Sequence, residues 1–116
     1  MKKYTGGCHC GAVTFEIEAD ITEVMACNCS HCKMKGFLLV FIPAEQFTLH
    51  SGEENLTEYL FNKKHIHHMF CKTCGTEPFA RGADSSGKET VAINVRCLTD
   101  LDYDSLPVKE FNGKDY

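Results

Sequence analysis

Short stretches in which apolar and polar residues alternate recur along the chain, and they predict strands rather than helices. Residues 13–18 alternate strictly, which is typical of a strand with one buried face. Residues 37–42 are continuously apolar and stop at Pro43, so they predict a strand that is buried on both faces. Residues 43–47 fit one helical turn, and residues 47–50 alternate again. The first half of the chain therefore favours sheet structure.

The second half continues this pattern and adds turn signals, while residues from Leu98 onward are weakly patterned. Four β-rich runs predict strands, at residues 57–61, 66–70, 78–81 and 89–96. Two polar segments predict turns, at residues 62–64 and 84–87. The first two runs and the turn between them predict a hairpin. No amphipathic helix of useful length is evident. We therefore expect one mostly β domain that spans residues 1–116.

Length and charge narrow the possible partners. A chain of 116 residues suits a single domain with one modest core. Its formal net charge of -4 argues against nucleic acid or an anionic membrane as the main partner. The longest apolar run, residues 37–42, is far shorter than the roughly 20 residues of a membrane span. The basic first residues lead into no apolar segment, so we expect no signal peptide and a cytoplasmic location.

Cysteine is the informative residue type. The chain has eight cysteines, at positions 8, 10, 27, 29, 32, 71, 74 and 97. In a cytosolic chain of this size, metal binding is a better explanation than disulfides, and a bridge within C-x-C would be strained. The paired spacings fit an iron–sulfur cluster poorly, and redox C-x-x-C chemistry needs a βαβ context that is missing. Soft thiolates at these spacings favour zinc.

Two cysteine pairs together make one complete tetrahedral zinc site. Cys8 and Cys10 form a C-x-C, and on a strand positions i and i+2 point to the same face. Cys71 and Cys74 form a C-x-x-C followed by Gly75, which suits the positive φ that often ends such a turn. We call these residues the four-cysteine group and expect it to join distant parts of the chain through a structural zinc.

The three-cysteine group consists of Cys27, Cys29 and Cys32. Three thiols leave one zinc coordination position open, and an open position distinguishes catalytic from structural zinc. A water or a substrate thiol would complete the tetrahedron, and bound thiol would ionise near neutral pH. Alternatively, a protein ligand closes the site and makes it structural, and the candidates are Cys97, His31, His65, His67 and His68.

The remaining chemically active residues carry weaker expectations. Cys97 fits a small buried hydrophobe. The histidines that lie between cysteines, His9 and His31, are expected to point away from the metal. A partly exposed strand explains the other histidines, although one could serve as a base, and they are His65, His67 and His68. A substrate carboxylate could be held by a basic residue near the thiols, namely Lys33, Lys35 or Arg96.

Three motifs in this order resemble the glutathione-dependent formaldehyde-activating family, which also includes centromere protein V. They are Gly-Cys-His-Cys-Gly-Ala-Val-Thr-Phe at residues 7–15, Cys-Asn-Cys-Ser-His-Cys at 27–32 and His-Met-Phe-Cys-Lys-Thr-Cys-Gly-Thr at 68–76. Residues 93–98 also resemble the family's final core strand. The resemblance covers about residues 6–102, which is most of the chain.

The resemblance implies a fold, two metals and an activity. The fold is Mss4-like, with antiparallel sheets built around zinc. The structural zinc falls on Cys8, Cys10, Cys71 and Cys74, and a catalytic zinc falls on Cys27, Cys29 and Cys32. The activity is a carbon–sulfur lyase reaction that joins glutathione and formaldehyde in S-hydroxymethylglutathione, so the partners are a small thiol and an aldehyde.

Three further expectations concern how far this resemblance extends. The chain is shorter than the namesake enzyme, so the surfaces that grip the glutathione peptide are expected to be reduced. The open three-thiolate site is expected to lose its zinc sooner than the closed site, and the oligomeric state is not predicted. The rival function is a non-catalytic, zinc-stapled module that binds protein, because a fold does not dictate its function.

Overall fold

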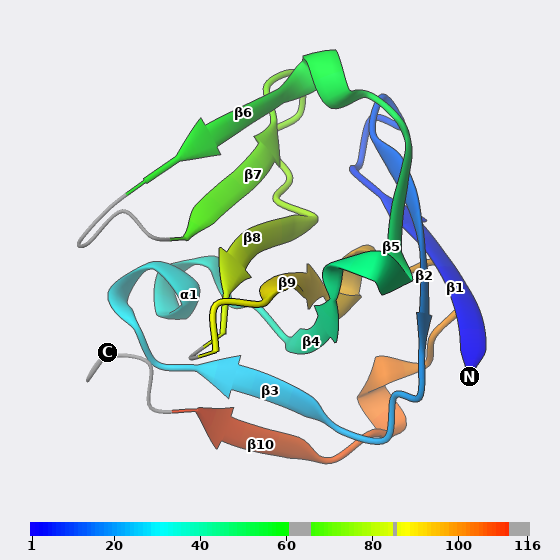
Figure 1. The fold of residues 1–116 in the computed structure, drawn as a ribbon, viewed down its shortest axis with the longest axis vertical. Coiled ribbons are helices and arrows are strands. Elements are labelled where there is room, and N and C mark those ends of the chain that lie inside the picture. The colour runs from blue at the N-terminus through cyan, green and yellow to red at the C-terminus, as the bar shows by residue number, and fades with distance from the viewer. Residues whose placement is uncertain (61–65, 85, 112–116) are drawn as a thin grey trace.

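Two sheets make up the fold that the computed structural model describes over residues 1–60, 66–84 and 86–111 (Figure 1). The small sheet has the order β1-β2-β5, and its strands are β1 (Lys2–Gly7), β2 (Thr14–Ala19) and β5 (Phe47–Ser51). The large sheet has the order β10-β3-β4-β9-β8-β7-β6. Its strands are β3 (Val24–Cys27), β4 (Leu39–Pro43), β6 (Leu56–Tyr59), β7 (His67–Cys71), β8 (Phe79–Ala83), β9 (Glu89–Asn94) and β10 (Val108–Phe111).

Strand pairing is antiparallel throughout the described residues, except that β10 runs parallel to β3. Helical segments are short, and they are α1 (Ser30–Lys35), η1 (Ala44–Gln46), η2 (Glu53–Asn55), η3 (Val95–Cys97) and η4 (Tyr103–Ser105). Within the described ranges, no helix has the length and apolar character needed to cross a membrane. The mostly β, Mss4-like architecture predicted from sequence is confirmed.

The main core lies where the two sheets face each other. Phe15 of β2 stacks on Phe47 of β5 with ring centroids 5.5 Å apart, and Phe79 of β8 lies 6.1 Å from Phe15. Phe15 and Phe79 are each 1% exposed, and full burial of such a side chain contributes roughly 1.5–3 kcal/mol. These aromatic contacts fix the small sheet against the centre of the large sheet.

Several predicted elements are confirmed and several need correction. The alternating segment at residues 13–18 becomes β2, which buries every second residue, and the predicted hairpin becomes the antiparallel pair β6–β7. Its predicted turn at residues 62–64 lies outside the described residues. The prediction that residues 37–42 are buried on both faces is wrong, because Phe41 of β4 is 47% exposed. An antiparallel sheet can leave one face in water, and a continuous apolar run does not reveal this.

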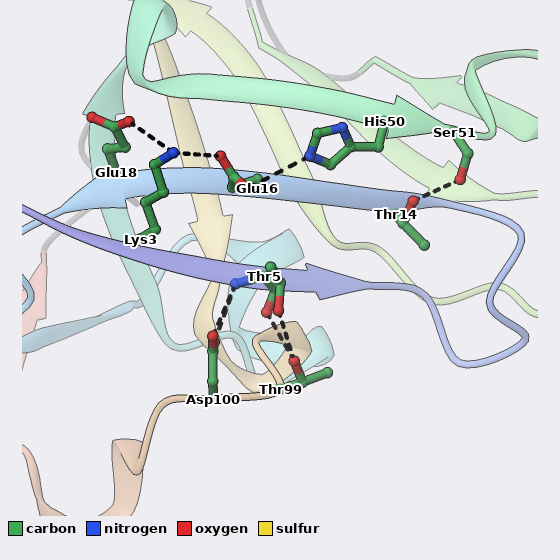
Figure 2. Close-up of polar contacts among 9 residues, drawn as sticks. All are labelled: Lys3, Thr5, Thr14, Glu16, Glu18, His50, Ser51, Thr99 and Asp100. Carbon is green, nitrogen blue, oxygen red and sulfur yellow. Dashed lines mark hydrogen bonds and ion pairs between the residues drawn. The ribbon is translucent and has the colours of Figure 1, made fainter.

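The N-terminal strand β1 is tied to the rest of the protein by polar contacts (Figure 2). Lys3 Nζ lies 3.8 Å from the Glu16 carboxylate on β2, and the Thr5 backbone N–H donates to Asp100 Oδ1 at 3.1 Å. The same side of β1 forms an isolated bridge between Gly6 and Leu98. These contacts place the chain that follows β1, which begins with Cys8, beside the end of the η3 segment.

Candidate metal centres

The first half of the four-cysteine group lies in a tight turn that follows β1. The prediction that Cys8 and Cys10 lie on a strand is wrong, because the Gly11 N–H donates to the Cys8 carbonyl at 3.2 Å and closes a turn. Gly11 has φ +83°, a left-handed conformation that glycine adopts without strain. The turn still converges both thiols, with the Cys8 and Cys10 sulfurs 3.6 Å apart.

The second half of the group lies in the turn that ends β7. The Gly75 N–H donates to the Cys71 carbonyl at 2.8 Å, and Gly75 has φ +79°, as its position in C-x-x-C-G predicted. The Cys71 sulfur lies 3.6 Å from the Cys10 sulfur, although the residues are 61 apart in sequence. The sulfurs of all four cysteines, Cys8, Cys10, Cys71 and Cys74, lie within 4.8 Å of one another.

Hydrogen bonds reach these sulfurs and lower the pKa of Cys71 and Cys74. The Ala12 backbone lowers the pKa of Cys10, but burial and the neighbouring thiols together raise it to about 11. The Val13 N–H points to the Cys8 sulfur at 3.3 Å, and the Asn55 side-chain amide donates to the Cys71 sulfur at 3.1 Å. Hydrogen bonding to the Thr76 hydroxyl and backbone lowers the pKa of Cys74 to about 5. The backbone N–H of Cys74 similarly lowers the pKa of Cys71. Sulfur–sulfur edges of a tetrahedral zinc site are about 3.8 Å for zinc–sulfur bonds of about 2.3 Å, so the 3.6 Å separations fit that ion.

The three-cysteine group is built from the end of β3 and the start of α1. Cys27 is the last residue of β3, Cys29 is the N-cap of α1, and Cys32 lies in that helix. The Cys32 N–H donates to the Cys29 sulfur at 3.3 Å, so the capping interaction also aims that sulfur inward. The three sulfurs lie within 4.8 Å of one another, as their spacing predicted. The helix itself was not predicted, because one turn and a half carries no amphipathic signal.

The C-terminal end of α1 is fixed independently of the cysteines. Gly36 caps the helix with φ +69°, and its N–H donates to the Cys32 carbonyl at 3.0 Å. Arg96 Nε donates to the Gly36 carbonyl at 3.1 Å and stacks over Tyr103 at 5.4 Å. Arg96 therefore holds the helix that carries two of the three thiols.

Two thiols of this group, those of Cys27 and Cys32, are biased toward the protonated form. Burial, followed by hydrogen bonding and charge from neighbouring thiols, raises the pKa of Cys32. Burial likewise raises the pKa of Cys27. Cys32 is buried, whereas Cys27 and Cys29 are half-buried. A bound cation would reverse this bias, because metal ligation requires the thiolate.

Several residues were considered as a fourth ligand of the three-cysteine group, and the structure gives some of them other contacts. Of the described residues, no fourth cysteine, histidine or acid lies within 4.8 Å of all three sulfurs. Cys97 belongs to neither group; its thiol contacts the Glu77 carbonyl at 3.9 Å, and burial raises its pKa to about 12. His67 pairs on the surface with Glu58 at 2.7 Å. His65 lies outside the described residues.

A third group of potential ligands was not predicted. His31 of α1, His68 of β7 and Glu77 place one donor atom each within 4.8 Å of the others, and we call them the His–His–Glu group. Burial lowers the pKa of His31, although the Glu77 charge opposes this. Sequence reasoning singled out both histidines but missed Glu77. The available signal was a single acid within the otherwise uncharged segment at residues 73–80.

Comparisons with known proteins agree with this geometry. The model of the glutathione-dependent formaldehyde-activating enzyme family matches residues 3–112. A crystal structure of a Rhodobacter sphaeroides protein is 31% identical and superimposes with a TM-score of 0.77. That similarity covers 90% of this chain and 99% of the other chain. The chain belongs to the glutathione-dependent formaldehyde-activating enzyme family.

Proposed function

We propose that this protein is a zinc-dependent carbon–sulfur lyase that joins a small thiol such as glutathione to an aldehyde such as formaldehyde, or catalyses the reverse. The observation that carries the proposal is the three-cysteine group: three converging thiols that no further cysteine, histidine, aspartate or glutamate side chain joins among the described residues. Such a group leaves room for a ligand from solution. Membership of the family supports the choice of thiol and aldehyde.

Two zinc ions would fit the two cysteine groups with different roles. The four-cysteine group would hold a structural ion, and the three-cysteine group would hold a catalytic ion. When bound at Cys27, Cys29 and Cys32, zinc would lower the pKa of an incoming thiol and supply it as a thiolate nucleophile. The donor chemistry suits this ion, because soft thiolate ligands select zinc over hard cations.

Residues around the three-cysteine group can position the substrate. Cys27 and Cys29 are only half-buried, so a small thiol can approach this side of the group. Lys33 and Lys35 lie on the last turn of α1 and are exposed, where their ammonium groups can attract the carboxylates of glutathione. Phe37 and Leu39 pack against the cysteines from the interior and exclude water on that side.

The bond changes in the proposed reaction are simple. The thiol gives up its proton to solvent, and its sulfur forms a bond to the aldehyde carbon. The electron pair of the carbonyl π bond moves to the oxygen, which then takes a proton from water. The product is a hemithioacetal, which is the S-hydroxymethyl adduct when the aldehyde is formaldehyde. The reverse reaction breaks the same carbon–sulfur bond. No oxidant or reductant is required.

The direct test is a glutathione titration of cobalt-substituted protein, followed by its sulfur-to-cobalt charge-transfer absorption. We expect glutathione to increase this absorption in the wild-type protein, because one more sulfur joins the metal. Cys29→Ser should abolish the increase. Cys97→Ser is the matched control, because it removes a thiol outside both groups and should preserve the increase.

Formaldehyde-dependent loss of free glutathione provides the second readout. The wild-type and Cys97→Ser proteins should accelerate this loss. Cys29→Ser should reduce the acceleration by about 100-fold or more, the lower end of what one positioned catalytic group typically contributes. A wild-type protein that ignores glutathione in both assays would overturn the proposal and favour the zinc-stapled binding module.

A further inference from the structure

The His–His–Glu group brings together three chain segments that are distant in sequence. His31 comes from α1, His68 from the middle of β7, and Glu77 from the connection between β7 and β8. Their side chains are 10%, 6% and 3% exposed, respectively. A carboxylate that is buried as deeply as Glu77 needs compensation for its charge.

The separations within the group are too long for strong hydrogen bonds. His31 Nε2 lies 3.5 Å from Glu77 Oε1, and His68 Nδ1 lies 3.3 Å from Glu77 Oε2. The surface pair His67–Glu58 in the same protein closes to 2.7 Å, which is an ordinary charge-assisted hydrogen bond. Among the described residues, Glu77 Oε1 makes no hydrogen bond at all.

The same separations match the edges of a metal coordination shell. Zinc–nitrogen and zinc–oxygen bonds of about 2.0–2.2 Å give tetrahedral edges of about 3.3–3.6 Å. The two nitrogen–oxygen distances, 3.5 Å to Oε1 and 3.3 Å to Oε2, lie in that range; since they reach different oxygens of Glu77, one ion between the rings would be bound by both carboxylate oxygens. The sulfur–sulfur distances of the four-cysteine group fit zinc by the same geometry.

Charge also favours a cation here. Over the described ranges, the ion pairs of Glu77 are with the two imidazoles, and neither lysine nor arginine contributes one. The imidazole centroids lie only 4.2 Å apart, so two charged rings would repel each other strongly. One divalent cation would neutralise the carboxylate and accept a lone pair from both neutral rings.

Surrounding groups hold the three side chains in place. The buried Asn94 side chain donates to the Glu77 carbonyl at 3.1 Å and fixes the backbone that carries the acid. His68 is fixed by its register opposite Ala80 in the β7–β8 pair. The His31 ring stacks on Tyr59, with centroids 5.5 Å apart. The donors are therefore preorganised by contacts with Asn94, Ala80 and Tyr59, which are not cysteine ligands.

We propose that His31, His68 and Glu77 form an additional metal site, which takes a first-row divalent cation that accepts imidazole ligands, with Zn²⁺ as the ion to test. Two histidines and one carboxylate are a donor set of zinc sites that keep an open position. The site goes beyond the proposed function, because its ligands are distinct from the seven cysteines.

The test compares zinc content after the protein is saturated with Zn²⁺ and then desalted. We expect His68→Asn and Glu77→Gln each to retain about one zinc ion per chain less than the wild type. His67→Asn is the matched control, because His67 is the neighbour of His68 on β7 but pairs with Glu58 on the surface. It should retain the wild-type content. Equal zinc content in all four proteins would overturn the site.

A second measurement needs no substitution and is independent of folding defects in the variants. Imidazole ¹⁵N chemical shifts of the wild-type protein are recorded as Zn²⁺ is added. We expect the chemical shifts of His31 Nε2 and His68 Nδ1 to change together as Zn²⁺ is added. Both changes should be complete when the zinc ion that the variants fail to retain has bound. Unchanged shifts of both rings at zinc saturation would overturn the site. Cys29→Ser separates this proposal from the previous one, because it should lose thiol binding but keep these histidine shifts.

Discussion

The two cysteine groups gather similar ligands from very different lengths of chain. The four-cysteine group joins the turn after β1 to the turn after β7, and its sulfurs Cys10 and Cys71 meet across 61 residues. The three-cysteine group uses one continuous stretch, residues 27–32, around the start of α1. A metal in the first group therefore closes a long loop, whereas a metal in the second constrains only a local turn.

The surroundings of the sulfurs also differ between the two groups, and they shift the pKa values of the thiols differently. In the four-cysteine group, hydrogen bonds lower the pKa values of Cys71 and Cys74, so these two thiols favour the thiolate that a cation needs, whereas the pKa of Cys10 is raised to about 11. Burial raises the pKa values of Cys27 and Cys32, so protons compete with the cation in the three-cysteine group. Under the proposed function, the four-cysteine group would hold the structural ion and the three-cysteine group the exchangeable one.

The largest expected effect is that of removing one ligand from each group. Cys74→Ser should abolish tight metal binding between β1 and β7 and lower the melting temperature by about 20 °C or more, because small zinc domains depend on their metal to fold. Cys29→Ser should lower it by about 5 °C or less. Thermal unfolding followed by circular dichroism measures both. A larger loss for Cys29→Ser would reverse the assignment of the two groups.

Glycine substitutions beside each group should produce the next largest effect. Gly52 has φ +91°, and a Cβ there would clash with the Ala12 carbonyl oxygen, in the turn that carries the first cysteine pair. We expect Gly52→Ala to cost about 3 kcal/mol, from left-handed strain plus overpacking. Gly36 caps α1 with φ +69° and open space around its Cβ position, so Gly36→Ala should cost about 1 kcal/mol.

Urea unfolding of the zinc-loaded variants measures the free energy of unfolding that each glycine substitution removes. Metal content shows whether a cysteine group has lost its ion. Gly52→Ala should also weaken metal retention by the four-cysteine group, because the Ala12–Val13 backbone would have to move. Gly36→Ala has strain without a steric clash and is the matched control. Equal losses of stability would show that the first turn can relax and that the two groups are packed alike.

Both cysteine groups could be found from sequence because their ligands are close neighbours within each motif. A C-x-C or C-x-x-C segment converges its thiols in almost any local conformation, so the wrong expectation of a strand at Cys8–Cys10 did not affect the ligand set. The actual turn depends on Gly11 at φ +83°, which the motif permits but does not require. Strand β10 was missed because it pairs parallel to β3 within a weakly patterned tail.

The His–His–Glu group was beyond sequence reasoning for a different physical reason. Its members meet only because β7 pairs with β8 in a register that places His68 opposite Ala80, and because α1 packs its His31 ring against the His68 ring. Neither the register nor the helix position can be derived from local spacing. His67 and His68 are adjacent, yet their opposite strand faces give one a surface partner and the other a buried one.

Acidification should release metal from the two cysteine groups in sequence. A thiol with a raised pKa is protonated at higher pH, so falling pH favours the metal-free form of the three-cysteine group first. In the four-cysteine group, Cys10 also has a raised pKa, of about 11, but the pKa of Cys71 is lowered and that of Cys74 is lowered to about 5, so these two keep their thiolates over a lower pH range. We expect two losses of cobalt charge-transfer absorption, separated by about one pH unit or more. Cys29→Ser should show only the loss at lower pH, and a single loss in the wild type would contradict this difference.

Cys97→Ser should have the smallest effect, and it tests whether Cys97 can be excluded as a metal ligand. The thiol is mostly buried, with its pKa raised to about 12 by burial, and it lies beside Cys8 and Cys74 without joining their group. A serine hydroxyl there is more costly to bury than a thiol, so we expect a loss of about 1 kcal/mol and unchanged metal content. Metal analysis and urea unfolding check this. Loss of one metal ion would mean that Cys97 is a ligand after all, and because it lies beside Cys8 and Cys74 the four-cysteine ligand set would then have to be reassigned.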